Sequence, residues 1–188
     1  MDGSGCLNEK FASPLVDTAS LNSDETPRHE GFTALLRCLL STDGSTTVFL
    51  EALAEEPVVV DVQSQRTCSP GAIPRYILGV QPGEPPLERK SRLYAKHSGT
   101  LLCDATAYLF LSSMPRDFAR GVAGKEIGLG RLLSECNVES KRVVLAPPKL
   151  LPSCGIAIKS YQIVRGDNLI CHITESFRLP SLMKFTSA

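Results

Sequence analysis

Two charged residues stand on strand faces that are otherwise apolar, and they suggest the chemistry of this chain. Between Leu169 and Phe177 the odd positions read Leu, Cys, Ile, Glu and Phe. Because side chains two apart in a strand share a face, Glu175 is expected on the core face. A buried carboxylate is costly unless it is paired or hydrogen-bonded. Glu175 therefore needs a partner.

The same alternation places Arg89 on the apolar face of the strand that begins at Leu87. The neighbouring strand presents Ala105 and Ala107, whose small side chains leave space above the sheet. Two interpretations are open. Arg89 and Glu175 could form a buried salt bridge that fixes the strand register. Alternatively, Arg89 binds a ligand carboxylate in an apolar pocket and Glu175 accepts a hydrogen bond from a ligand hydroxyl.

Two glycine-containing turns precede predicted helices. They are Asp43-Gly44-Ser45 and Gly128-Leu129-Gly130. Free backbone N–H groups at the start of a helix bind carboxylates. Each turn is thus a candidate anion contact, with an ordinary glycine-assisted turn as the alternative.

Composition narrows the class of protein. The chain has 188 residues, 43% of them hydrophobic, which suits one globular domain. Its 20 basic and 20 acidic residues balance, so no overall field attracts nucleic acid or an anionic membrane. We expect no signal peptide and no membrane partner, because the apolar runs are short and the N-terminus has no basic start. The protein is expected to be a monomer or a homodimer.

The seven cysteines are odd in number and form no C-x-x-C pair, and with three histidines they give no zinc spacing. This pattern favours reduced thiols in a cytoplasmic protein without a metal or cofactor.

The pattern of apolar residues predicts the order of the elements. Residues 1–30 are polar and are expected to form a flexible tail, and residues 31–188 to form one domain. Helices are predicted over 32–40, 45–53, 115–122 and 127–136. Strands are predicted over 58–65, 87–96, 100–111, 140–146, 156–164 and 169–177, with a short further one at 76–78. Strands joined by hairpins with helices between them indicate an α+β fold around an antiparallel sheet.

Several segments together resemble one enzyme family. They are, in chain order, Leu40–Thr47, Val58–Gln65, Arg89–Leu93, the Ala105 strand ending at Met114-Pro115, Ile127–Leu133, Val138–Arg142 and Tyr161–Phe177. Their order and spacing are similar to those of the chorismate pyruvate-lyase family, which makes 4-hydroxybenzoate. The resemblance runs from Leu35 to Phe177.

The resemblance implies a six-stranded antiparallel sheet with helices packed over one face and a ligand beneath helical flaps. It implies that Arg89 binds the substrate carboxylate and that Glu175 is the essential glutamate, the two forming the catalytic pair. Leu129 and Ser45 correspond to residues whose backbone N–H groups contact the ligand. The implied reaction converts chorismate to 4-hydroxybenzoate and pyruvate without a cofactor or metal.

Two departures keep other functions open. Gly128 replaces a proline that often stands there in the family, and Arg92 offers a competing arginine, although alternation places it outside. One alternative is a related enzyme that acts on another cyclic enol ether or acid. The other is a non-catalytic sensor of an aromatic acid, since ligand-sensing domains of some bacterial transcription regulators share this fold. Those domains are normally fused to a winged-helix domain, for which residues 1–30 are too short.

Overall fold

The computed structural model describes residues 27–69, 85–112, 114–125, 127–144 and 147–186, with side chains from residue 33 onward. Most of the predicted tail and the short strand predicted at 76–78 lie outside these ranges. The first helix begins at Pro27, so it includes the last residues of the predicted tail. The flexible tail itself stays a prediction.

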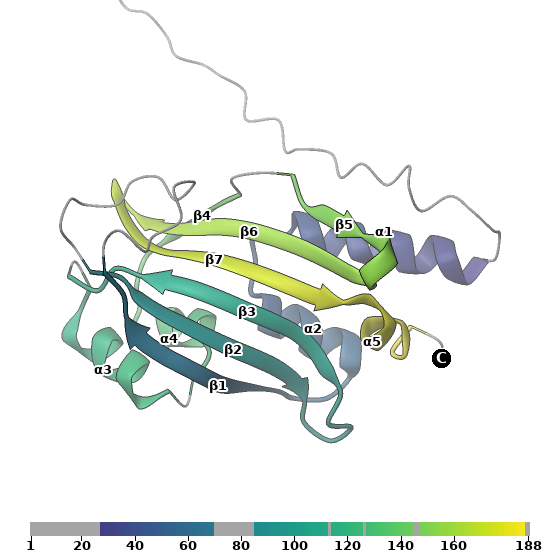
Figure 1. Ribbon diagram of the computed structural model, residues 1–188, viewed down its shortest axis with the longest axis horizontal. Coiled ribbons are helices and arrows are strands. Elements are labelled where there is room, and N and C mark those ends of the chain that lie inside the picture. The colour runs from purple at the N-terminus through teal and green to yellow at the C-terminus, as the bar shows by residue number, and fades with distance from the viewer. Residues whose placement is uncertain (1–26, 70–84, 113, 126, 145–146, 187–188) are drawn as a thin grey trace, which may run out of the picture.

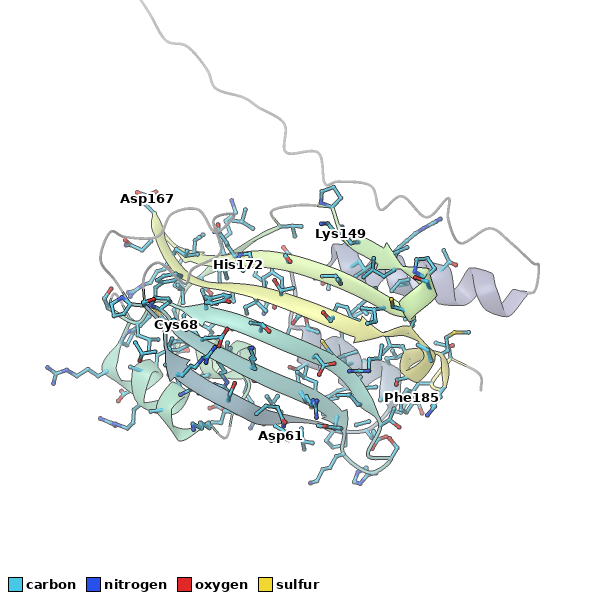
Figure 2. All side chains as sticks on the ribbon, in the orientation of Figure 1. Asp61, Cys68, Lys149, Asp167, His172 and Phe185 are labelled. Atoms are coloured by element: carbon cyan, nitrogen blue, oxygen red, sulfur yellow. The ribbon has the colours of Figure 1, made fainter. Side chains whose placement is uncertain are left out.

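Seven strands form one antiparallel sheet. They are β1 (Val58–Thr67), β2 (Leu87–Ala95), β3 (Leu101–Leu109), β4 (Lys141–Val144), β5 (Lys149–Leu151), β6 (Ile156–Arg165) and β7 (Asn168–Arg178). The order across the sheet is β1-β2-β3-β7-β6-β4, and β5 also pairs with β6. Figure 2 shows Asp61 on β1 and Lys149 on β5 at opposite edges of the sheet.

The outer position beside β6 is divided between two short strands. β4 pairs with Tyr161–Val164 of β6, whereas β5 pairs with Ile156–Ile158. Pro147 and Pro148 stand between them, and proline has no N–H to continue a ladder. The predicted six-stranded sheet is confirmed, with its last position split into β4 and β5.

Five α-helices accompany the sheet. They are α1 (Pro27–Ser41), α2 (Thr46–Ala54), α3 (Arg116–Gly124), α4 (Leu129–Glu135) and α5 (Leu179–Met183). Figure 1 looks onto the sheet with these helices behind it, where α3 and α4 gather at one end of the strands and α1, α2 and α5 at the other. The α+β class with helices over one face is therefore confirmed. Helix α5 and strand β5 were not predicted.

The core under the helices has two parts. One contains Leu36, Leu39, Leu50 and Leu182 from α1, α2 and α5, packed on Phe177 and other strand residues. The second packs apolar residues of α3 and α4 on the other end of the same face. The site described below lies between these two apolar clusters.

The predicted faces of the strands are confirmed. On β2, Arg89, Ser91, Leu93 and Ala95 are buried and Lys90 and Arg92 are exposed, whereas Tyr94 is half-buried and Glu88 is buried. Every odd position of β7 from Leu169 to Phe177 is buried as well.

Within the described ranges, no helix is both long and apolar enough to cross a bilayer. The same part of the chain contains no group of three or more His, Cys, Asp or Glu side chains placed to hold a metal ion.

Candidate functional site

A cavity of about 60 Å³ lies between the sheet and the first residues of α2 and α4. The four residues that the sequence singled out, Arg89, Glu175, Ser45 and Leu129, all line it. Its remaining lining residues are Thr46, Thr47, Val60, Ser91, Leu93, Ala105, Ala107, Gly128, Gly130, Arg142, Tyr161 and Ile173. Residues far apart in the chain thus meet at one place.

Arg89 projects from β2 into this cavity and is 1% exposed. Its Nη2 donates to the carbonyl oxygen of Ile127 at 2.7 Å, which ties β2 to the turn before α4. Its Nη1 is buried and has no acceptor among the described residues. Burial lowers the pKa of the guanidinium from its ordinary value. An arginine in this position can still bind an acidic group with its second nitrogen.

Glu175 faces the same cavity from β7 and is 5% exposed. Its two oxygens accept from the Thr46 hydroxyl at 2.9 Å and the Tyr161 hydroxyl at 3.1 Å. Burial raises the pKa of the carboxyl, and these hydrogen bonds together with the nearby charge of Lys159 offset only part of that rise. The carboxyl is thus held in place by hydroxyl groups.

Arg89 and Glu175 do not pair with each other, because no ion pair joins them in the described part of the chain. In the strand register Arg89 lies opposite Ala107, whereas Glu175 lies opposite Ala105. Strand β3 therefore lies between the two charges, and its small residues Ala105 and Ala107 line the cavity, where the sequence predicted space. The interpretation as a structural salt bridge is not supported.

Ser45 caps the start of α2, as predicted. Its Oγ accepts from the N–H of Val48 at 3.5 Å, which satisfies one of the free N–H groups at the start of the helix. Gly128 precedes α4 in an extended conformation with no side-chain cap. A Cβ there would lie 3.2 Å from the Val60 side chain, which explains why glycine suits this close approach. Backbone contacts from Ser45 and Leu129 to a ligand stay predictions.

The sequence analysis missed four neighbours of the site: Thr46, Tyr161, Lys159 and Arg142. The alternation test, applied to β6, would have found two of them, because Lys159 and Tyr161 share a buried face with Ala157. Thr46 lies one residue after a predicted cap and Arg142 lies on a four-residue strand, so neither had a clear periodic signal.

Lys159 is a second buried cation beside the site, 2% exposed and opposite Glu175 in the strand register. Its Nζ donates to the carbonyl oxygen of Leu39 at 3.2 Å and to that of Thr42. These carbonyls end α1, where a positive charge is favourable. Burial nevertheless lowers the pKa of the ammonium group, while Glu175 partly raises it. Lys159 thus holds the chain between α1 and α2 against the sheet.

Neither a protein-family model nor a curated protein sequence matches this chain. Solved structures do resemble it. PhnF from Mycobacterium smegmatis is 14% identical with a TM-score of 0.53, and the match covers 73% of this chain and 65% of PhnF. The chain thus spans slightly less than two thirds of the whole PhnF protein. The structure of the PhnF effector domain gives the same identity and TM-score and is 90% covered.

A GntR-family transcriptional regulator from Enterococcus faecalis V583 is 10% identical with a TM-score of 0.41, covering 65% of this chain and 94% of that one. At these identities the comparison shows a shared fold. It is the fold that the resemblance to chorismate lyases implied.

The prediction that the chain is a chorismate pyruvate-lyase enzyme is wrong. The solved structures that share its fold with a TM-score above 0.5 are PhnF and the effector domain of PhnF, and neither is a lyase. The catalytic roles assigned to Arg89 and Glu175 fall with that prediction. The resemblance identified the fold correctly, but a fold does not decide function, since one fold hosts several functions.

Proposed function

We propose that the chain is a non-catalytic ligand-binding module that binds a small aromatic or cyclic organic acid in the cavity beneath α2 and α4. In this proposal Arg89 binds the carboxylate of the ligand, and Glu175 with Tyr161 contacts a hydroxyl group. The effector domain of PhnF, which shares the fold, supports a sensing role. Residues 31–188 would constitute this module.

The proposal rests on the burial of the Arg89 guanidinium and on its unsatisfied hydrogen-bond donor. A guanidinium that is almost fully buried is costly unless its donors are satisfied. Here one nitrogen binds a single carbonyl oxygen, and Nη1 has no acceptor in the described part of the chain. A ligand carboxylate would supply both the missing acceptor and the missing negative charge.

Glu175 would set the selectivity of the site. Its oxygens already accept two hydroxyl donors, and burial raises the pKa of its carboxyl. A ligand hydroxyl can meet such a group, whereas a second acidic group beside it would be repelled once Glu175 is ionised. The acidic group of the ligand is therefore expected on the Arg89 side of the cavity.

The size of the cavity implies movement on binding. Its volume of about 60 Å³ is far below the roughly 300–1,000 Å³ of ordinary small-molecule pockets. The first turns of α2 and α4 form its walls, so these segments must move outward to admit an aromatic acid. A ligand that binds only the open arrangement shifts the protein toward it, and that shift is how a sensor transmits occupancy.

The proposal is tested by titrating the purified chain with 3-hydroxybenzoate in a calorimeter. We expect saturable binding to the wild-type protein and a loss of about tenfold or more in affinity for Arg89→Gln, because hydrogen bonds to charged groups are worth about 1.5–3 kcal/mol. Arg92→Gln is the matched control, since Arg92 lies on the same strand but is exposed.

Two results would contradict the proposal. One is the absence of binding to the wild-type chain at about 10 mM probe, which lies beyond the range of weak specific sites. The other is binding that Arg89→Gln and Arg92→Gln weaken to the same extent.

A further inference from the structure

Arg142 lies between the inner cavity and a second, larger hollow. The inner cavity of about 60 Å³ and an outer pocket of about 440 Å³ have two lining residues in common, Gly130 and Arg142. Asp43 and Lys141 line only the outer pocket, whereas Arg89 and Glu175 line only the inner one. The Arg142 side chain is therefore part of the wall that separates them.

The contacts of Arg142 connect three elements around the cavity. Its Nη1 donates to the carbonyl oxygen of Asp43 at 2.5 Å, in the turn before α2. Its guanidinium lies 5.6 Å from the centre of the Tyr161 ring on β6. Its Nη2 would lie 3.4 Å from a Cβ added to Gly130, in the first turn of α4. The side chain thus closes the cavity at the point where α2 and α4 approach each other.

No acidic side chain of the described residues forms an ion pair with Arg142, although Glu175 is near enough for the charge of Arg142 to oppose the rise of its pKa. The buried Nε of Arg142 has no acceptor within the same residues. Arg89, on the other side of the cavity, is in the same situation. Among the described residues, Glu175 is the only acidic one that lines the inner cavity. The lining therefore carries an excess of positive charge.

The two arginines enter the cavity from opposite sides. Arg89 is on β2 and Arg142 is on β4, and three strands lie between them in the sheet. At about 4.8 Å per strand their backbones are roughly 19 Å apart. Two guanidinium groups that converge from such separated positions suit two acidic groups at opposite ends of one small molecule.

We propose that Arg142 binds a second acidic group of the ligand at the mouth of the cavity, so that the module selects a small cyclic dicarboxylic acid over a monocarboxylic one. This inference rests on the proposed function, in which Arg89 binds the first carboxylate. A ligand that passes from the outer pocket to the inner cavity must separate Arg142 from the Asp43 carbonyl. The second carboxylate then replaces that carbonyl as the acceptor, and the charge of Arg142 is balanced.

The test compares two probes that differ by one carboxylate: 3-hydroxybenzoate and 5-hydroxyisophthalate. Both are titrated into the full chain as the wild type, Arg142→Gln and Arg131→Gln. Arg131 is the matched control, since it is exposed on α4 and lines neither cavity. We expect the wild type to bind the dicarboxylate about tenfold or more tightly than the monocarboxylate. Arg142→Gln should lose this preference while keeping its affinity for 3-hydroxybenzoate, and Arg131→Gln should keep both.

The other outcomes distinguish a failure of the role proposed for Arg142 from a failure of the proposed function. Equal affinity of the wild type for the two probes, or a preference that survives in Arg142→Gln, would overturn the role of Arg142 and leave the proposed function intact. If neither probe binds the wild-type chain, the proposed function fails together with this inference. Should Arg142→Gln not fold, the ratio of the two wild-type affinities still decides, and Arg142→Lys, which keeps the charge, should retain part of the preference.

Discussion

Charged side chains on the two faces of strands β2, β3 and β7 have different kinds of partner. On the face away from the helices, Asp104 of β3 binds Arg92 of β2 at 3.2 Å and Arg178 of β7 at 2.6 Å. These side chains are 35–45% exposed. On the covered face, Arg89 of β2 and Glu175 of β7 are almost fully buried and yet do not pair. Asp104 is thus satisfied by two cations, whereas Arg89 and Glu175 are held by neutral groups.

Because of this difference, the exposed and the buried charges are expected to contribute differently to the stability of the fold and to ligand binding. Exposed ion pairs contribute little to folding because water already solvates both partners. A buried arginine without a counter-charge costs free energy. In the proposed function, ligand binding and not stability accounts for the presence of Arg89 on the covered face. Substitutions on the two faces should respond accordingly.

The largest effect is expected for Arg89→Met, which replaces the buried guanidinium by an apolar side chain of similar length. We expect the free energy of unfolding to rise by about 1–3 kcal/mol, as when buried charges are replaced by well-packed apolar residues. Urea denaturation followed by circular dichroism measures it. The matched change on the other face, Arg92→Met, should bring no such gain. A loss of stability in Arg89→Met would mean that the residue holds the fold and not a ligand.

A smaller, pH-dependent effect is expected for Glu175→Gln, which keeps the size of the side chain and one acceptor oxygen. Because burial raises the pKa of Glu175, the folded protein binds the proton more tightly than the unfolded chain does. The contribution of this group is most favourable below the ordinary value of 4.5 and is lost as the pH rises through the raised pKa.

The stability of Glu175→Gln relative to the wild type should therefore increase as the pH rises above 4.5. Denaturation curves of both proteins over this pH range measure the difference in their free energies of unfolding. The titratable groups that the two proteins share contribute equally to both and cancel in that difference. Parallel pH profiles would show that Glu175 keeps an ordinary pKa, which would break the contrast between the two faces.

The smallest effect is expected for Asp104→Asn on the exposed face. The substitution removes the acceptor charge shared by Arg92 and Arg178. We expect the melting temperature to change by about 2 °C or less, and the change to disappear in about 1 M salt, which screens exposed charges. Calorimetry at low and high salt measures both. A large change that persists in high salt would mean that the exposed cluster is structural.

Much of the fold could be predicted because it depends on local patterns. Alternation identified the inner faces of β2 and β7, and the cap at Ser45 located the start of α2. β5 has three residues and α5 has five, so neither carries a period that can be recognised. Pro147 and Pro148 precede β5 and predict a loop there. β5 forms because its backbone pairs with that of β6.

The candidate site was predicted in part. Arg89 and Glu175 could be found because a charge interrupts an apolar face. Thr46 and Tyr161, which hold Glu175, and Arg142, which closes the cavity, depend on contacts between distant segments. Sequence resemblance also led to an enzyme, whereas the fold is shared with the effector domain of PhnF, which is not a lyase.

The sequence alone determined which residues face inward, because the side-chain period of a strand follows from its backbone geometry. It thereby placed Arg89 and Glu175 on the covered face of one sheet. Whether the two charges met was decided by the tertiary structure. The pairing of the strands placed β3 between them, and the first turn of α2 brought Thr46 to the carboxylate. Pairing across strands depends on register and on the packing of distant helices, which no local pattern encodes.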